Sequence, residues 1–190
     1  MSAPAAGGQR LSLPGAPPRV VLDNIRSAFN VGSIFRTCDA AGARPLYLCG
    51  ICATPGNPRV VKTALGAEAT VPWSHHISTL EVIAQLQAEG VFCVGVERTE
   101  RSAPYDLEEY PERVAFVFGH EVAGIALPVL ERCDRVVGIP MLGRKNSLNV
   151  ATSVGVMLFE IVRRRLAGSF PASPPGQAPS PSGDQLSSSS

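Results

Sequence analysis

The sequence predicts an α/β fold, a mostly parallel sheet flanked by helices. Short apolar runs of strand length alternate with longer segments of helical pattern along most of the chain, and such alternation is typical of parallel sheets covered by helices on both faces. Both ends of the chain are instead rich in Pro, Gly, Ala or Ser, a composition with too few apolar residues to form a core. We therefore expect one domain over residues 19–167, between disordered tails at 1–18 and 168–190.

The ends of two helices are marked by individual residues. Gly42 ends a helix over 31–41, because glycine readily adopts the left-handed conformation that closes a helix. Ser78 and Glu81 have the spacing of a capping box and predict a helix that ends at Gly90. The other expected elements are strands at 20–22, 45–49, near 71, and at 91–96, 114–118 and 135–139, short helices at 60–65 and 127–132, and a long apolar helix at 148–166.

Three of these strands are followed by a loop rich in Asn, Arg, Glu, Ser and Gly, and each loop leads into a helix. Ligands of open α/β sheets bind beyond the carboxyl ends of the strands, so the three loops predict one composite pocket. The third loop contains Ser147 and Asn149 just before the last helix. These residues are typical N-caps, but the unpaired N–H groups and the dipole of a helix start also attract electron-rich ligand atoms.

Order, spacing and identity of the residues in the three loops form a combined motif. Its residues are Asn30, Gly32, Arg36 and Thr37 in the first part, Phe118, Gly119, Glu121, Gly124 and Ile125 in the second, and 139–141 with 147–150 in the third, with 62–67 between the first two parts. Together they resemble the SpoU (TrmH-like) family of RNA ribose 2′-O-methyltransferases, within the SPOUT class. The resemblance runs from about residue 19 to about residue 165. His120 departs from it, since many relatives have Asn or Ser there.

The resemblance implies that residues 114–166 form a deep trefoil knot, although chain threading is rare and periodicity alone favours an unknotted fold. It also implies a homodimer that transfers a methyl group from S-adenosylmethionine to a ribose 2′-hydroxyl of tRNA or rRNA. The cofactor is expected on the knot loops, mostly through backbone groups. The implied cofactor-binding positions are Val96, Glu97, Gly119, Ile139, Met141, Ser147 and Leu148.

Arg36 aligns with the arginine that relatives are proposed to use in activating the hydroxyl. Arginine is a poor base because it stays protonated far above neutral pH, so stabilising a developing alkoxide or anchoring a phosphate is physically easier. Asn30, Ser147 and Asn149 can orient the hydroxyl, the phosphate or the arginine by hydrogen bonds. Glu121 can hold Arg36 or a knot loop. Structural bonding between loops is the alternative role for these four residues.

The net charge of +1 shows no overall preference for nucleic acid, so contact with RNA depends on local basic patches. Arg144 and Lys145 form one such patch. The arginines at 163–165 form another, or else serve as favourably placed cations at a helix C-terminus. A non-catalytic RNA-binding module with the same fold is the alternative function. A dinucleotide-dependent dehydrogenase ranks last, because no G-x-G-x-x-G follows the first strand.

We expect a cytoplasmic protein, because no apolar run is long enough to span a bilayer and the N-terminus lacks the pattern of a signal peptide. The five cysteines are scattered among the expected elements and fit reduced thiols. Cys49 and Cys52 could complete a zinc site with His75 and His76. Their spacing matches none of the usual zinc fingers, so we expect no metal.

Overall fold

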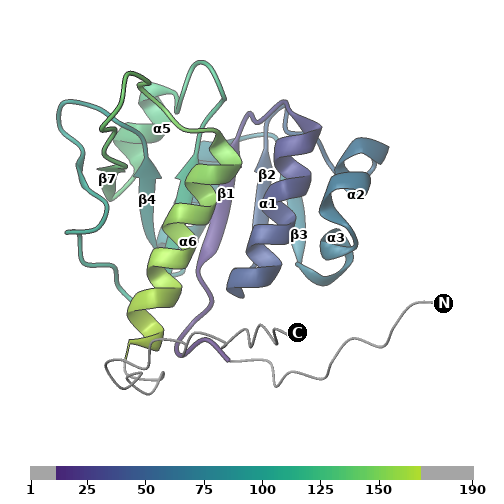
Figure 1. Ribbon diagram of the computed structural model, residues 1–190, viewed down its shortest axis with the longest axis horizontal. Coiled ribbons are helices and arrows are strands. Elements are labelled where there is room, and N and C mark those ends of the chain that lie inside the picture. Colours follow the sequence, from purple (N-terminus) through teal and green to yellow (C-terminus); the bar gives the residue numbers. More distant parts are fainter. Residues whose placement is uncertain (1–11, 168–190) are drawn as a thin grey trace, which may run out of the picture.

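The computed structural model describes residues 12–167, which form a seven-stranded sheet in the order β3-β2-β1-β6-β4-β7-β5 (Figure 1). Every pair of neighbouring strands is parallel, so the predicted α/β fold is confirmed. The threading of a knot over 114–166 stays a prediction. The strands are β1 (Arg19–Asp23), β2 (Leu46–Cys49), β3 (Trp73–His76), β4 (Phe92–Val96), β5 (Ala103–Pro104), β6 (Val114–Phe118) and β7 (Arg135–Gly138).

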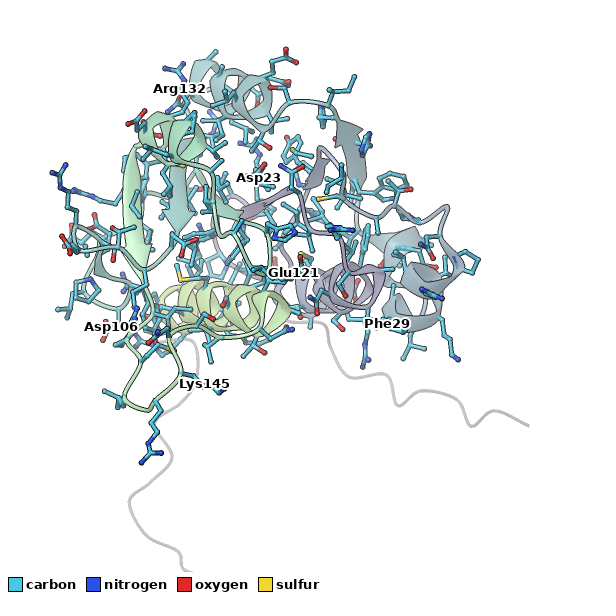
Figure 2. The ribbon with its side chains drawn as sticks, turned by 90° about the horizontal axis from the view of Figure 1, so that it is seen from above. Asp23, Phe29, Asp106, Glu121, Arg132 and Lys145 are labelled. Atoms are coloured by element: carbon cyan, nitrogen blue, oxygen red, sulfur yellow. The ribbon has the colours of Figure 1, made fainter. Side chains whose placement is uncertain are left out.

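Helices cover both faces of this sheet, as the view from above shows (Figure 2). Side chains alternate between the faces along a strand, so Val20 and Leu22 of β1 enter one core while Val21 enters the other. The first core contains α1 (Ala28–Ala41), α2 (Pro58–Ala64), α3 (Ala67–Thr70) and α6 (Val150–Leu166), and the second contains α4 (Thr79–Ala88) and α5 (Leu127–Arg132). None of these helices in the described part of the chain is long and apolar enough to cross a membrane.

Local capping explains where the longer helices begin and end. Ser27 accepts a hydrogen bond from the Asn30 N–H, which starts α1 three residues before the expected 31, and Gly42 ends it at φ 68° as predicted. Ser78 accepts from the Glu81 N–H at the start of α4. Asn149 caps α6 through the Ala151 N–H, so this helix begins at 150 rather than at the expected 148.

Two elements were not predicted, and one was misplaced. Helix α3 has four residues, too few for a helical period to show in the sequence. Strand β5 has two residues and exists because it pairs with β7, with Ala103 opposite Val137. The strand expected near residue 71 lies at 73–76, where it pairs with β2 at the edge of the sheet. Each of these elements depends on its neighbours in space.

The prediction of disorder up to residue 18 is wrong for residues 12–18. The Ala16 N–H donates to the Glu112 carboxylate over 2.9 Å, and the Arg165 guanidinium donates to the Ala16 carbonyl. Gly15, at φ 82°, lies against the same glutamate. The partners come from distant parts of the chain, so the composition of the stretch could not reveal them. The tails at 1–11 and 168–190 lie outside the described residues.

The arginines at 163–165 act largely within the fold. Arg164 donates to the carbonyls of Asp106 and Glu108, and its guanidinium lies 5.1 Å from the centre of the Tyr110 ring. Hydrogen bonds from Arg163, and then from Arg164, lower the pKa of Glu160 to about 2 against the effect of its burial. These contacts fasten the last turn of α6 to the segment before β6. They give the arginines a structural role that does not require contact with RNA.

Candidate active site

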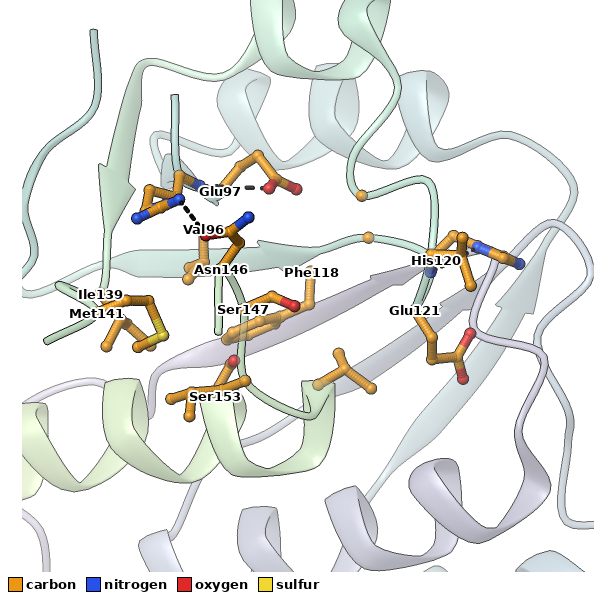
Figure 3. A pocket seen from close by; sticks show the side chains of 16 residues that line it. Val96, Glu97, Phe118, His120, Glu121, Ile139, Met141, Asn146, Ser147 and Ser153 are labelled. Carbon is orange, nitrogen blue, oxygen red and sulfur yellow. Dashed lines mark hydrogen bonds between the residues drawn. The ribbon is translucent and has the colours of Figure 1, made fainter. Parts of the chain in front are cut away.

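A pocket of about 150 Å³ opens at the carboxyl ends of β4, β6 and β7, beside the start of α6 (Figure 3). Parallel strands end at the same edge of the sheet, which is why segments far apart in the sequence meet here. All seven residues expected to bind the cofactor line the pocket. The complete lining is Val96, Glu97, Arg98, Phe118, Gly119, His120, Glu121, Val122, Gly124, Ile139, Met141, Asn146, Ser147, Leu148, Val150 and Ser153.

The composition of the pocket differs from the expected composite of three loops. The second and third loops line it, but the first loop, over 23–37, does not, and the residues after β4 take its place. The motifs in the sequence did not single out Arg98, Asn146 and Ser153 as lining residues. Ser153 had a usable signal, because it lies four residues after Asn149 on the same face of α6. Asn146 belongs to the third loop, which was expected at the pocket. Arg98 had no signal, because its guanidinium meets the Asn146 amide across 48 residues, at 3.4 Å.

A chain of hydrogen bonds joins the pocket to the first loop. The Asn149 amide donates to Asn30 Oδ1 over 3.1 Å, and the Asn30 amide donates to Glu121 Oε1 over 3.1 Å. The Glu121 carboxylate also accepts from the backbone N–H groups of Ser27 and Arg26, at 3.1 and 3.4 Å. Three of the proposed catalytic residues therefore bond to one another, and they link all three loops.

Hydrogen bonds stabilise the ionised form of Glu121. Partial burial works against ionisation, but hydrogen bonds from its own backbone and from Ser27, Asn30 and Arg26 lower the pKa of Glu121 overall. The carboxylate is ionised at neutral pH and accepts from all of these donors. In this chain Glu121 holds the first loop, and Arg36, one of the two partners that the sequence suggested for it, is not among its hydrogen-bond donors.

Arg36 and Ser147 stand outside this chain of hydrogen bonds. Ser147 lines the pocket just before α6, with its side chain exposed. Arg36 lies exposed on α1, away from the pocket lining. Within residues 12–167, none of the four ion pairs includes Arg36. The role of Arg36 in catalysis stays a prediction.

His120 shapes the turn that follows β6. Its Nδ1 accepts from the backbone N–H groups of Val122 and Ala123, at 3.1 and 3.2 Å, which leaves the ring proton of the neutral imidazole on Nε2. An Asn or Ser side chain can accept from the same backbone donors. His120 can therefore accept the same backbone hydrogen bonds as an Asn or Ser side chain at this position.

The residues of the alternative zinc site are engaged elsewhere. Cys52 Sγ donates to the Leu22 carbonyl and accepts from the Ile25 N–H. His75 Nε2 lies 2.9 Å from the Gly50 carbonyl oxygen. Over the described part of the chain, no three His, Cys, Asp or Glu side chains are grouped as metal ligands.

The fold and the pocket define an α/β protein whose ligand site lies at the carboxyl ends of parallel strands. The chain matches the model of the SpoU rRNA Methylase family over residues 17–159. The chain belongs to this family. Its resemblance in sequence to the SpoU motifs is thereby confirmed.

Curated relatives agree with this assignment. The 23S rRNA (guanosine-2′-O-)-methyltransferase RlmB of Ralstonia nicotianae is 37% identical over 153 residues, which are 80% of this chain and 60% of the relative. The RlmB protein of Vibrio vulnificus is 34% identical over 154 residues, 80% of this chain and 61% of the relative. The chain thus spans about three fifths of the length of the relatives it matches.

Solved structures show the same fold. The AdoMet-bound rRNA methyltransferase from Sinorhizobium meliloti superposes with a TM-score of 0.74 at 31% identity, over 82% of this chain and 59% of the other. The SpoU methyltransferase AviRb from Streptomyces viridochromogenes, in complex with AdoMet, gives 0.75 at 28% identity, over 86% and 63%.

Proposed function

We propose that the chain is an S-adenosylmethionine-dependent RNA methyltransferase that modifies a ribose 2′-hydroxyl of rRNA or tRNA, in the cytoplasm. One observation carries the proposal: the seven positions that the SpoU motif assigns to the cofactor line one pocket of the fold. The names of the relatives support the choice of RNA and of the ribose hydroxyl. Two structural neighbours that bind AdoMet support the choice of cofactor.

The lining of the pocket fits this cofactor chemically. Apolar side chains of Val96, Ile139 and Leu148 can contact the adenine ring, while backbone groups at the strand ends can bond its nitrogen atoms. The Ser147 hydroxyl supplies a polar group for the hydroxyls or the charged amino-acid end of the cofactor. When bound, the cofactor supplies an activated methyl group on a sulfonium.

The residues of the chain have separate tasks in this reaction. The ribose would be oriented by Ser147 and by the hydrogen-bonded residues Asn149, Asn30 and Glu121 at the pocket. Holding the 2′-hydroxyl beside the methyl group in this way makes their bimolecular reaction effectively intramolecular. Arg36 would stabilise the negative charge that develops on the 2′-oxygen, since a guanidinium stays charged throughout. The ionised Glu121 keeps the first loop, which leads into the helix of Arg36, in place.

S-adenosylmethionine and its demethylated product are expected to raise the melting temperature of the protein. A ligand that binds only the folded state stabilises it by about 2.7 kcal/mol at one hundred times its dissociation constant. Thermal melts with each compound, and with NAD as the control, measure this effect. No shift and no heat of binding at millimolar S-adenosylmethionine would show that the cofactor is wrong.

We further propose a homodimer formed by the outer faces of α1 and α6. Phe29 on α1 and Phe159 on α6 are 56% and 49% exposed, and such apolar surface suits an isologous interface. Figure 2 shows the two helices side by side beneath the sheet. This interface would bring Arg36 of one copy towards the pocket of the other.

Light scattering at micromolar concentration is expected to give the mass of a dimer. Phe159→Glu should give a monomer, because a charge is buried without a partner in the interface. Leu127→Glu on α5 is the matched control, since Leu127 is 65% exposed beside the opposite face of the sheet and should leave the dimer intact. A monomeric wild-type protein contradicts the proposal.

A further inference from the structure

Glu97 joins two of the segments that form the pocket (Figure 3). It directly follows β4, and its carboxylate oxygen Oε2 accepts a hydrogen bond from the Ile125 N–H over 3.0 Å. Its other oxygen, Oε1, accepts from the neighbouring Arg98 N–H over 3.3 Å. The side chain therefore fastens the turn after β6 to the end of β4.

Glycine is required at two positions of this turn, and at one of them it leaves room for the carboxylate. Gly124 has φ 70°, and a Cβ atom there would lie 2.4 Å from Glu97 Oε2. A Cβ atom at Gly119 would lie 2.3 Å from the backbone of Gly124. His120 and Gly124 exchange two backbone hydrogen bonds, at 3.0 and 2.9 Å, which close the turn. The turn is thus compact, and the Glu97 carboxylate occupies the space beside Gly124 that a Cβ atom would need.

The same turn also carries Glu121, which bonds the start of α1 on its other side. Two carboxylates thus hold the turn, Glu97 at its end and Glu121 near its beginning. We propose that Glu97 is a positioning residue, whose side chain holds the turn 119–125 so that Gly119 and Glu121 face the pocket. It acts by the reach of its oxygen to the Ile125 N–H, and its charge does not contact the cofactor.

Two substitutions of Glu97 separate the effect of its side-chain length from the effect of its charge. Glu97→Gln keeps the length of the side chain and one oxygen that can accept from Ile125, but it removes the charge. Glu97→Asp keeps the charge and shortens the side chain by one methylene, which takes the carboxylate out of hydrogen-bonding distance. Glu100→Asp is the matched control, because Glu100 lies exposed on the same loop and outside the pocket lining.

Amide hydrogen exchange tests the turn without any ligand. In Glu97→Asp the Ile125 amide is expected to exchange about tenfold faster than in the wild type, as for the loss of about 1.4 kcal/mol of local stability. In Glu97→Gln and Glu100→Asp this amide should keep its wild-type rate within about threefold. Amides of β6 should not change in any variant, which separates a local effect from a loss of global stability.

Titration with S-adenosylmethionine gives the second measurement, which rests on the proposed function. Glu97→Asp is expected to bind about tenfold more weakly, and Glu97→Gln within about threefold of the wild type. The inference is overturned if the Ile125 amide is unchanged in Glu97→Asp, or if Glu97→Gln loses as much affinity as Glu97→Asp. A faster Ile125 amide in a protein whose wild type binds no S-adenosylmethionine would support the role of Glu97 and contradict the cofactor.

Discussion

Replacing Arg36 by Ala is expected to lower the rate of ribose methylation by about 10²–10³-fold, the effect of losing one group that stabilises an oxyanion. Affinity for S-adenosylmethionine should stay unchanged, because Arg36 lies on α1 and does not line the pocket. An interaction made only in the transition state lowers turnover without weakening the binding of the cofactor. Arg36→Lys should recover little activity if a planar guanidinium is required.

The measurement uses undermethylated rRNA and tRNA with labelled cofactor, followed by digestion and mass spectrometry of the nucleosides. Arg59→Ala is the control, because Arg59 is also exposed on a helix of the same face, α2, and has no assigned role. A methyl group on a base, or wild-type activity in Arg36→Ala, would refute the proposed chemistry. Loss of cofactor binding in Arg36→Ala would instead place this residue in the cofactor site.

Replacing Gly119 by Ala is expected to weaken cofactor binding by more than about tenfold and to destabilise the protein by about 1–3 kcal/mol, as for overpacking of a filled site. The new Cβ atom would lie 2.3 Å from the backbone of Gly124 and from the Ile125 nitrogen. Backbone atoms cannot rotate away as a side chain can, so the turn after β6 must open. Opening it moves Glu121 and one wall of the pocket.

Chemical denaturation and calorimetric titration measure the two effects of Gly119→Ala. Gly143→Ala is the control in the loop before α6, because no atom beyond its two chain neighbours lies within 4 Å of a Cβ atom built at Gly143. This variant should keep both stability and affinity. Equal behaviour of the two variants would show that the close contact at Gly119 does not shape the pocket.

The elements that the sequence predicted are those with local causes. Alternating apolar runs gave the parallel sheet, Ser78 marked the start of α4, and Gly42 marked the end of α1, because each signal acts over one turn or one strand. The short elements α3 and β5 escaped prediction. Helix α3 packs against α1 and strand β5 pairs with β7, and these partners lie far away in the sequence.

For the candidate site, the sequence by itself determined the family, seven of the sixteen positions that line the pocket, and the polar residues beside it. These follow from motifs whose residues lie close together along the chain. Only the tertiary structure decided what those residues contact. It joined Glu121 to Asn30 across 91 residues and Glu97 to Ile125 across 28, and it tied Arg165 to Ala16 across 149. Such pairings depend on how the strands are ordered in the sheet, and no local pattern of residues encodes them.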